Sequence, residues 1–512
     1  MENKTIILIV MSVYMVLLLL WGIYQGRKVK TGKDFAIAGR KLPGWVAALS
    51  ERATGESSWA LLGLPGAAYA TGMLEIWTAI GCVCGILVAW IVLAARLRDE
   101  AEKYDVETFT GYIAKRHGEV GKWIRIAGSF TIVFFFFFYV GAQFLGGGKT
   151  LHNLFDINQN WGMLIIVLLV IPYTIYGGFR SVTYTDVIQA ILMIVTLIIA
   201  PIAGVIYLSN MPEGSVFAHS ISEALSKVGE SYSTMTGGAV VPEDSALFTT
   251  LNNLFPNSLD MVEGLGAGII IAGAFSWFFG YLGGQPQLSM RFMAIKDARQ
   301  AKIARNIGVV WTIIAYVGAL MIGFIGIAIF GPQGLEDQET VMPEVLTTVF
   351  HPVVSGILIT GVLAAIISTA NSLLILSATE LSENIIKPIR NKDMDGRSSL
   401  MQSRAVTALL SGVALLLAYF SPSDLIYSIV GYVWAGIGST FSIVILLTLF
   451  WKKYHGIPAL LTIIVGLVFT IAWISTGMDE IITARIMTFI VAGLTAVIST
   501  ICIRKRPIEN LT

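Results

Sequence analysis

The sequence predicts an all-α membrane protein, because its composition is too apolar for a water-soluble domain and its apolar residues gather in long runs. Of the 512 residues, 55% are hydrophobic and only 13% are charged, and the mean hydropathy is +0.75. A soluble domain could not keep this much apolar surface out of water. The net charge of +1 gives no indication of a nucleic-acid partner, so the lipid bilayer is the expected surrounding.

Thirteen apolar runs of about 20 residues, the length that crosses a bilayer as a helix, follow one another along the chain. The first run is too long for a secretory signal and has no small-residue cleavage site, so we expect it to remain as a helix. The expected spans lie near 5–25, 43–69, 74–95, 124–148, 160–178, 186–208, 263–286, 305–331, 346–380, 405–421, 424–450, 457–476 and 483–503.

Basic residues fall in alternate loops, which predicts the orientation because cytoplasmic loops are rich in lysine and arginine. The loops between them are short or acidic. The N-terminus is therefore expected outside, the C-terminus in the cytoplasm, and the chain in the plasma (inner) membrane as a multi-pass protein. The basic residues are Arg27, Lys28, Lys30, Lys33, Arg40 and Lys41, then Arg96, Arg98, Lys103, Lys115 and Arg116, then Arg291, Lys296, Arg299 and Lys302, then Lys387, Arg390, Lys392 and Arg397, then Lys452 and Lys453, and finally Arg504, Lys505 and Arg506.

Two expected spans that lie five apart are both interrupted by glycine and proline. Unwound backbone at membrane depth is tolerated only where protein or a cavity satisfies it, and paired interruptions in two halves are typical of inverted-repeat transporters with a site at the midplane. We expect one transporter domain over 1–512, with a first helix and loop (5–42), two repeats (43–208 and 263–450), an extracytoplasmic loop (209–262), and two further helices with a tail (451–512). The interrupting residues are Gly55, Gly63, Pro65 and Gly66 in the first case, and Gly280, Gly283, Gly284 and Pro286 in the second.

Two further features mark the interior as polar. Arg52 and Glu56 lie inside the second expected span, where each charge costs about 2.5–3.5 kcal/mol and so persists mainly facing protein or a watery cavity. In the ninth span, small and hydroxylated residues share one face, which serves either close helix packing or a hard cation that takes oxygen ligands. These residues are Ala365, Ser368, Thr369 and Ser372. Asp186 is either a further ligand or an ordinary helix-start acid.

At the level of motifs, the chain resembles the solute:sodium symporter family, and most closely the bacterial sodium/proline symporters, over nearly its full length. The periplasmic loop is the part that matches least. The matching motifs are AGR at Ala38–Arg40, ALS at Ala48–Ser50, GLPGA at Gly63–Ala67, Thr71, Gly72 and Glu75, RLR at Arg96–Arg98, GGF at Gly177–Phe179, TD..QA at Thr185–Ala190, GY.G.QP along the seventh span, RFMA at Arg291–Ala294, and LAA..ST at Leu363–Thr369.

The resemblance implies a leucine-transporter type of fold with a 5+5 inverted repeat, and sodium-driven uptake of a small solute, most closely L-proline, by alternating access. It implies no enzyme activity, no cofactor besides sodium as coupling ion, and no obligate protein partner. The implied sodium site uses the backbone carbonyls of Ala53, Glu56 and Ala365 and the hydroxyls of Ser368 and Thr369. A second ion site would use Asp186, Ser368, Asn371 and Ser372, with asparagine in place of a usual hydroxyl. The implied substrate pocket contains Tyr139, Trp277, Tyr281 and Pro286.

Two departures from the proline carriers leave alternatives open. Gly55 stands where those carriers have an aspartate, while Arg52 and Glu56 are charges that they lack. Glu56 could replace the missing carboxylate, the two charges could form a structural ion pair at i, i+4, or Glu56 could carry a proton while Arg52 stands in for a cation. One extra glycine lies between Tyr281 and Pro286. The alternative function is therefore symport of another amino acid or organic acid, proton-coupled or independent of sodium.

Other classes of membrane protein fit the sequence less well. A sensor on this fold would normally carry a signalling domain after the last span, and nine residues follow Ile503. An intramembrane enzyme would need a metal or nucleophile constellation. A channel agrees with the composition, but paired broken helices around one central site favour a carrier.

Overall fold

The computed structural model describes residues 2–30, 32–118, 120–227, 268, 271–332, 334–390, 396–421 and 423–503. Most of the expected extracytoplasmic loop (209–262), the start of the seventh expected span and the tail from residue 504 lie outside the described residues.

In its described parts the chain is helical, with an isolated bridge between Leu42 and Ile295 as its only β-type pairing. The first half contains α1 (Glu2–Gly26), α2 (Gly32–Ile37), α3 (Gly44–Ser58), α4 (Leu64–Thr71), α5 (Glu75–Val88), α6 (Ala94–Lys103), α7 (Phe109–His117), α8 (Gly121–Phe155), α9 (Gln159–Asn210) and α10 (Ile221–Lys227). The second half contains α14 (Trp277–Gly280), α15 (Pro286–Ala294), α16 (Ala298–Phe330), α17 (Val341–Val349), α18 (Pro352–Leu381), α19 (Lys387–Arg390), α20 (Gly396–Tyr419), α21 (Ile426–Val433), α22 (Thr440–Phe450), α23 (Gly456–Ser475) and α24 (Ala484–Cys502).

Ten helical stretches among the described residues are long and apolar enough to cross a membrane. Some of them join expected spans: Gly44–Lys103 runs through two, and α9 covers both 160–178 and 186–208. The join in α9 is bent at Gly178, where φ is 57° and a Cβ atom would lie 2.5 Å from the ring of Phe35. Only glycine fits there. The expectation of a multi-helix membrane protein is thus confirmed, whereas the count of thirteen stays a prediction.

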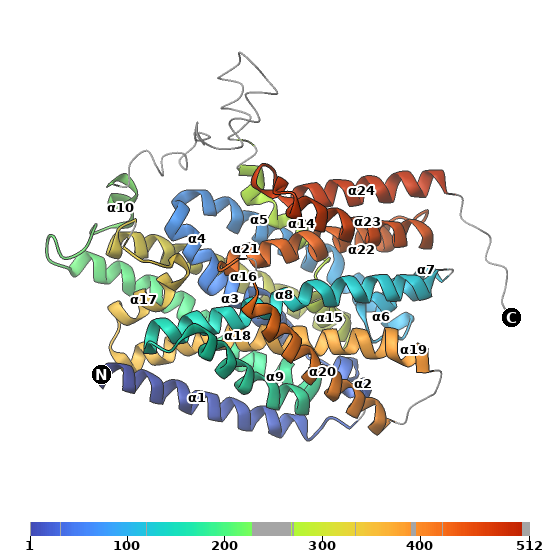
Figure 1. The fold of residues 1–512 in the computed structure, drawn as a ribbon, viewed down its shortest axis with the longest axis horizontal. Helices are drawn as coiled ribbons and strands as arrows, with labels where there is room; N and C mark the ends of the chain where they lie inside the picture. The colour runs from blue at the N-terminus through green and yellow to red at the C-terminus, as the bar shows by residue number, and fades with distance from the viewer. Residues whose placement is uncertain are drawn as a thin grey trace, which may run out of the picture.

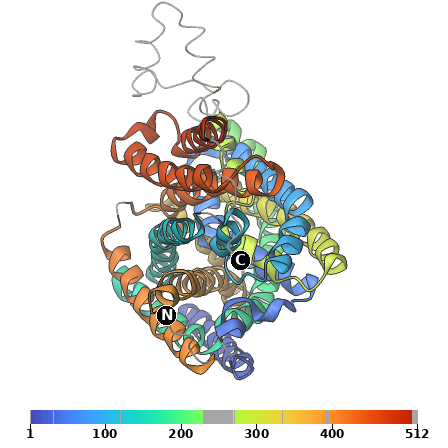
Figure 2. The ribbon, with the colours of Figure 1, turned by 90° about the vertical axis from the view of Figure 1, so that its right-hand side faces the viewer.

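The helices run along the long axis of the molecule and pack side by side around central ones (Figures 1 and 2). The N-terminus and α17 lie at one end of this axis, and α6, α7 and α19 lie at the other, which we call the basic end (Figure 1). Helix α18 is central: every residue from Leu358 to Glu380 is buried, and it packs against α1, α3, α8 and α9. Its hydroxylated residues therefore face protein on all sides.

One basic residue does not lie where the sequence suggested. Arg291, expected in a cytoplasmic loop, is fully buried inside α15, while Lys296, Arg299 and Lys302 are exposed as expected. The helix continues past Arg291 to Ala294 and carries the guanidinium into the bundle. The expectation for Arg291 was wrong, because a count of basic residues cannot separate a buried arginine from a loop arginine a few residues away.

Candidate functional site

The break in the second expected span lies at Ser57, in the last turn of α3, where the backbone has φ 49° and ψ −166°. A π-helical turn over Trp59–Gly63 follows directly after α3. Glycine and proline predicted a break in this segment, but its position falls on a serine. The N–H of Ser58 donates to Oε1 of Gln143 at 3.0 Å. One turn earlier, the carbonyl of Thr54 accepts from Oγ1 of Thr369 at 3.0 Å. The break thus turns backbone groups of α3 toward α8 and α18.

The break in the seventh expected span lies where the glycines predicted it. Helix α14 ends at Gly280, α15 begins at Pro286, and Gly283 has φ 85°. A Cβ atom on Gly284 would lie 2.1 Å from the carbonyl oxygen of Gly438. Glycine is required here because two backbones approach this closely, and the N–H of Gly284 donates to Oγ of Ser442 at 3.2 Å.

The hydroxyl face of α18 lies against α3 and α9, as the spacing of its residues predicted. Oγ of Ser372 lies 3.0 Å from Oγ1 of Thr54. Oγ of Ser368 donates to Asp186 at 2.6 Å, and Oγ of Ser50 donates to the other oxygen of the same carboxylate at 2.6 Å. Asp186 is fully buried in the interior of α9, so it is not a helix-start acid. The result is a buried, oxygen-rich site between three helices.

A guanidinium occupies the part of this site where a second ion would bind. Nη2 of Arg291 donates to Oγ of Ser372 at 2.5 Å and to Oγ1 of Thr54 at 3.0 Å, and it lies 3.4 Å from Oδ2 of Asp186. Asn371, expected beside Asp186, accepts instead from Thr174. Sequence reasoning missed both Arg291 and Thr54. The RFMA motif, which contains Arg291, can be recognised in the sequence, but the sequence does not show that its arginine is buried.

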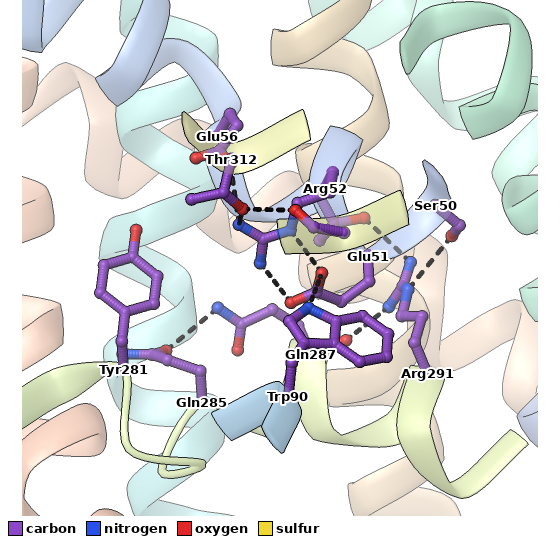
Figure 3. A network of polar contacts seen from close by, with 12 residues as sticks. Ser50, Glu51, Arg52, Glu56, Trp90, Tyr281, Gln285, Gln287, Arg291 and Thr312 are labelled. Atoms are coloured by element: carbon purple, nitrogen blue, oxygen red, sulfur yellow. Dashed lines mark hydrogen bonds and ion pairs between the residues drawn. The ribbon is translucent and has the colours of Figure 1, made fainter. Parts of the chain in front are cut away.

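A second charged network lies in α3, next to this site (Figure 3). Arg52 donates from Nη1 to Oε1 of Glu56 at 2.8 Å and to Oγ1 of Thr312 at 3.0 Å. It also pairs through two nitrogens with Glu51, which accepts from Nε1 of Trp90 at 3.2 Å. The carboxylates and the guanidinium are all buried. The ion pair between Arg52 and Glu56 is therefore present, but Glu51, which the sequence reading passed over, shares its arginine.

With Glu51, Arg52 and Glu56 all in their charged forms, the network has a net charge of −1. One of its carboxylate oxygens has no partner among the described residues. Oε2 of Glu56 is buried and accepts no hydrogen bond from the described residues. Burying such an atom costs free energy unless a donor or a cation reaches it. Glu56 therefore presents an open acceptor at the α3 break.

Aromatic rings fill the other side of the break. The indoles of Trp59 and Trp277 stack at 4.2 Å. Trp434 contacts Tyr139 at 5.2 Å, Tyr281 at 5.3 Å and Trp277 at 5.8 Å between ring centroids. Three of the expected pocket residues thus gather around Trp59 and Trp434, which sequence reasoning did not select although Trp59 stands directly after the polar GESS motif.

Polar groups border this aromatic cluster. Oη of Tyr139 donates to Oγ of Ser57 at 3.0 Å. Other buried polar atoms here have no partner among the described residues, namely Nε1 of Trp59, Nε1 of Trp434, Oγ of Ser58 and Nε2 of Gln285. Pro286, the fourth expected pocket residue, is buried at the first turn of α15. Unpaired donors around apolar rings are what a small ligand with a carboxylate and an apolar body would use.

At the end opposite the basic end, an ion pair links three elements. Nζ of Lys149 lies 2.8 Å from Glu339 and 2.8 Å from Asp337. Glu339 also accepts from the N–H groups of Ile426 and Tyr427, each at 2.9 Å, at the start of α21. Burial raises the pKa of Glu339, an effect that Lys149 opposes. We call this arrangement the Glu339 clasp. It joins the segment before α17 to α8 and α21.

The basic end is more open. A cavity of about 430 Å³ is lined by residues between α6 and α7, by Arg125 of α8, and by residues near the end of α18. Among the described residues, the Glu339 clasp thus ties elements together at one end, and the cavity lies at the other.

Paired broken helices around a buried oxygen-rich site are the arrangement typical of a secondary transporter. A family model for the sodium:solute symporter family matches residues 35–466. The chain belongs to the sodium:solute symporter family, and it is not an enzyme.

Relatives and a solved structure agree with this assignment. The chain is 32% identical over 498 residues to the high-affinity proline transporter PutP of Bacillus subtilis strain 168, covering 97% of this chain and 98% of the relative. It is 33% identical over 474 residues to sodium/proline symporter 2 of Staphylococcus saprophyticus, covering 91% and 85%. The structure of a sodium-coupled sialic acid symporter in a substrate-bound outward-open state superposes with a TM-score of 0.75 at 17% identity, covering 98% of each chain. That structure supports the fold alone.

Proposed function

We propose that this protein takes up L-proline together with sodium by alternating access. Its relatives are named as proline transporters and sodium/proline symporters over nearly their full length. The observation that carries the proposal is the break at Ser57, which lies between the oxygen-rich site on α18 and the aromatic cluster. The same interruption of α3 would thereby contribute groups to the ion site on one side and to the substrate site on the other.

Sodium as the transported ion would bind the carbonyls of Ala53, Glu56 and Ala365 and the hydroxyls of Ser368 and Thr369. This proposal is supported by the contact between Thr369 and the carbonyl of Thr54. Carbonyl and hydroxyl oxygens are ligands that hard cations prefer. Asp186 supplies a negative charge one hydrogen bond from Ser368.

Proline would bind in the aromatic cluster, between Tyr139, Trp277, Tyr281 and the start of α15 at Pro286. The stacked rings of Trp59 and Trp277 would separate to admit an apolar ring of similar thickness. Its carboxylate would accept from the free indole N–H groups, and its amine would donate to Oε2 of Glu56. Glu56 would in this way serve the substrate instead of replacing the aspartate of the proline carriers.

The second ion position would hold no mobile cation. Arg291 already contacts Thr54, Ser372 and Asp186 there, and a second positive charge at the same oxygens would be repelled. We therefore propose one sodium ion for each proline.

We further propose a 5+5 inverted repeat over 43–208 and 263–450, thirteen spans, and an N-terminus outside the cell. The two broken helices support the repeat because α15 packs against α3. The position of the N-terminus and of α6, α7 and α19 at opposite ends supports the orientation (Figure 1).

The deciding experiment is uptake of radiolabelled L-proline into proteoliposomes under a sodium gradient, an equal potassium gradient, or a proton gradient alone. Accumulation that needs sodium is the expected result. Accumulation driven by protons alone would refute sodium coupling and point to Glu56 as a proton carrier. Absence of proline uptake under every gradient would refute the substrate.

A further inference from the structure

A second oxygen-rich cluster lies on α18, nearer the basic end than Ser368. The buried carboxylate of Glu380 accepts from Nδ2 of Asn384 at 2.6 Å and from Oγ of Ser129 at 2.8 Å. It also accepts from the N–H and the hydroxyl of Thr110. Nδ2 of Asn384 also lies 2.6 Å from the hydroxyl of Thr110, 3.0 Å from that of Ser129 and 3.2 Å from that of Thr108, so this amide stands among the oxygens and would have to turn its Oδ1 inward to admit a cation. We call these residues, Glu380, Asn384, Ser129, Thr110 and Thr108, the Glu380 cluster.

The charge of Glu380 has no basic partner among the described residues, since every group that it contacts is neutral. Three cations line the cavity beside Asn384, and within the described residues none of them forms a hydrogen bond or ion pair with Glu380: Lys115 donates to the carbonyl of Tyr104 at 3.0 Å, Lys387 pairs with Glu383 at 2.9 Å, and Nε of Arg125 has no hydrogen-bond partner in the described part of the chain. A buried carboxylate without an opposite charge is expensive. Three hydroxyls and an amide oxygen around it are ligands that suit a hard monovalent cation.

Glu380 lines one small cavity, and its neighbours Thr108 and Asn384 line a larger one. The cavity of about 430 Å³ at the basic end reaches Thr108 and Asn384. A small cavity of about 10 Å³ is lined by Glu380, Phe179 and Met290, which is room for about one water-sized body. The ring of Phe179 lies 5.0 Å from the guanidinium of Arg291, which in turn contacts Ser372 and Asp186.

Spacing along α18 connects the same places. Ser368, Ser372, Leu376, Glu380 and Asn384 recur at every fourth position, the last of them in the turn that follows α18. Each step turns about 40° around the helix, so neighbours in this series lie one above the other while its two ends face different directions. Four of these five side chains carry an oxygen. Glu380 therefore lies farther along α18 than Ser368 and Thr369, on the side where its partner Asn384 lines the open cavity.

We propose that the Glu380 cluster is a second sodium-binding site, which receives the ion on its way from the central site to the cytoplasm. The direction of release rests on the proposed function. The binding chemistry does not, because it needs only a monovalent cation and the oxygens of this cluster.

The test is Glu380→Gln in proteoliposomes, with sodium varied separately on each side. We expect the internal sodium concentration that half-inhibits proline uptake to rise about tenfold, equal to about 1.4 kcal/mol, while the external concentration that half-activates uptake changes less than about twofold. Glu102→Gln, an exposed carboxylate that pairs with Arg98 at 2.7 Å and does not line this cavity, is the matched control and should leave both values unchanged. Equal changes on both sides, or no change, would overturn the proposal.

Two further measurements keep the result decisive. Thr110→Val removes one hydroxyl at nearly constant volume and should give a smaller shift of the same sign, so the test survives if Glu380→Gln does not fold. Binding of ²²Na⁺ to the purified protein needs no organic substrate. If the wild type fails to move proline, the proposed function fails, yet a loss of ²²Na⁺ binding in Glu380→Gln still supports this site. Equal ²²Na⁺ binding in both proteins refutes it.

Discussion

Replacing Arg52 by glutamine should destabilise the protein strongly, because it leaves two buried carboxylates without their cation. Arg52 is fully buried and is the only basic side chain that the described residues place against Glu51 and Glu56. Removing one member of a buried ion pair costs about 3–5 kcal/mol, mainly through the uncompensated charge that remains. The wild-type network carries a net charge of −1, and the variant would carry −2 in the same volume.

The loss of stability in Arg52→Gln can be measured as a change in the melting temperature of the purified protein in detergent. An unfolding entropy of about 2.1 cal/mol/K per residue over 512 residues amounts to about 1.1 kcal/mol per kelvin. The variant should therefore melt about 3–5 °C lower. The control is Lys227→Gln, which removes an exposed i, i+4 pair with Glu223 at 2.6 Å and should change the stability by less than about 1 kcal/mol.

A double variant separates charge from packing. Glu51→Gln combined with Arg52→Gln restores the net charge of the network to −1 and should recover a large part of the lost melting temperature. A drop below about 1 °C in Arg52→Gln would refute the reasoning, since it would mean that the carboxylates are protonated or reach water. No recovery in the double variant would show that shape, not charge, governs this network.

Three further outcomes follow from the site. Thr369→Ala should raise the external sodium concentration that half-activates uptake by about tenfold, because the loss of one oxygen ligand is worth about 1.4 kcal/mol. Thr71→Ala is the control and should leave that concentration unchanged, because the hydroxyl of Thr71 bonds its own helix. Equal effects of the two variants would exclude the proposed ion site. Trp277→Ala should raise the KM for proline at nearly constant Vmax, and the same substitution at the exposed Trp123 is the control. An unchanged KM in Trp277→Ala would show that Trp277 is not part of the substrate pocket. Burial raises the pKa of Glu339 in the closed clasp, so protonation of Glu339 favours the protein with the clasp closed, and uptake should slow as the pH falls through that pKa. Glu339→Gln should remove this pH dependence of uptake. If the variant keeps it, another group is responsible for the pH dependence.

The sequence predicts the helices well because a membrane-spanning helix needs a long run of apolar residues, which can be seen in the composition of the segment itself. Long apolar runs recur as α1, α8, α16, α18, α23 and α24. The glycines of the seventh span also place the second break correctly, since close backbone contact at Gly284 requires the missing Cβ atom. Features that depend on the local residue type, such as an apolar span or a glycine break, can thus be predicted from the sequence.

The remaining features depend on partners that are distant in the chain. The first break falls at Ser57 and not at a glycine, because Gln143 on α8 captures the N–H of Ser58. Arg291 was counted with loop cations, although Asp186 and Ser372 hold it inside the bundle. Neither contact leaves a local pattern, so neither could be predicted before the helices were placed in space.

The position of Ser57 explains how one ion can control one substrate. Within a single helical turn, the carbonyl of Thr54 accepts from Thr369 of the proposed ion site, and the hydroxyl of Ser57 accepts from Tyr139 in the aromatic cluster. An ion that binds the carbonyls before the break restrains the same turn that positions Tyr139. Linkage then requires that the substrate raise the affinity for the ion by the same factor, with a coupling of about 1–3 kcal/mol. In this proposal the coupling needs no long path through the protein, because the proposed ion and substrate sites share one piece of unwound backbone.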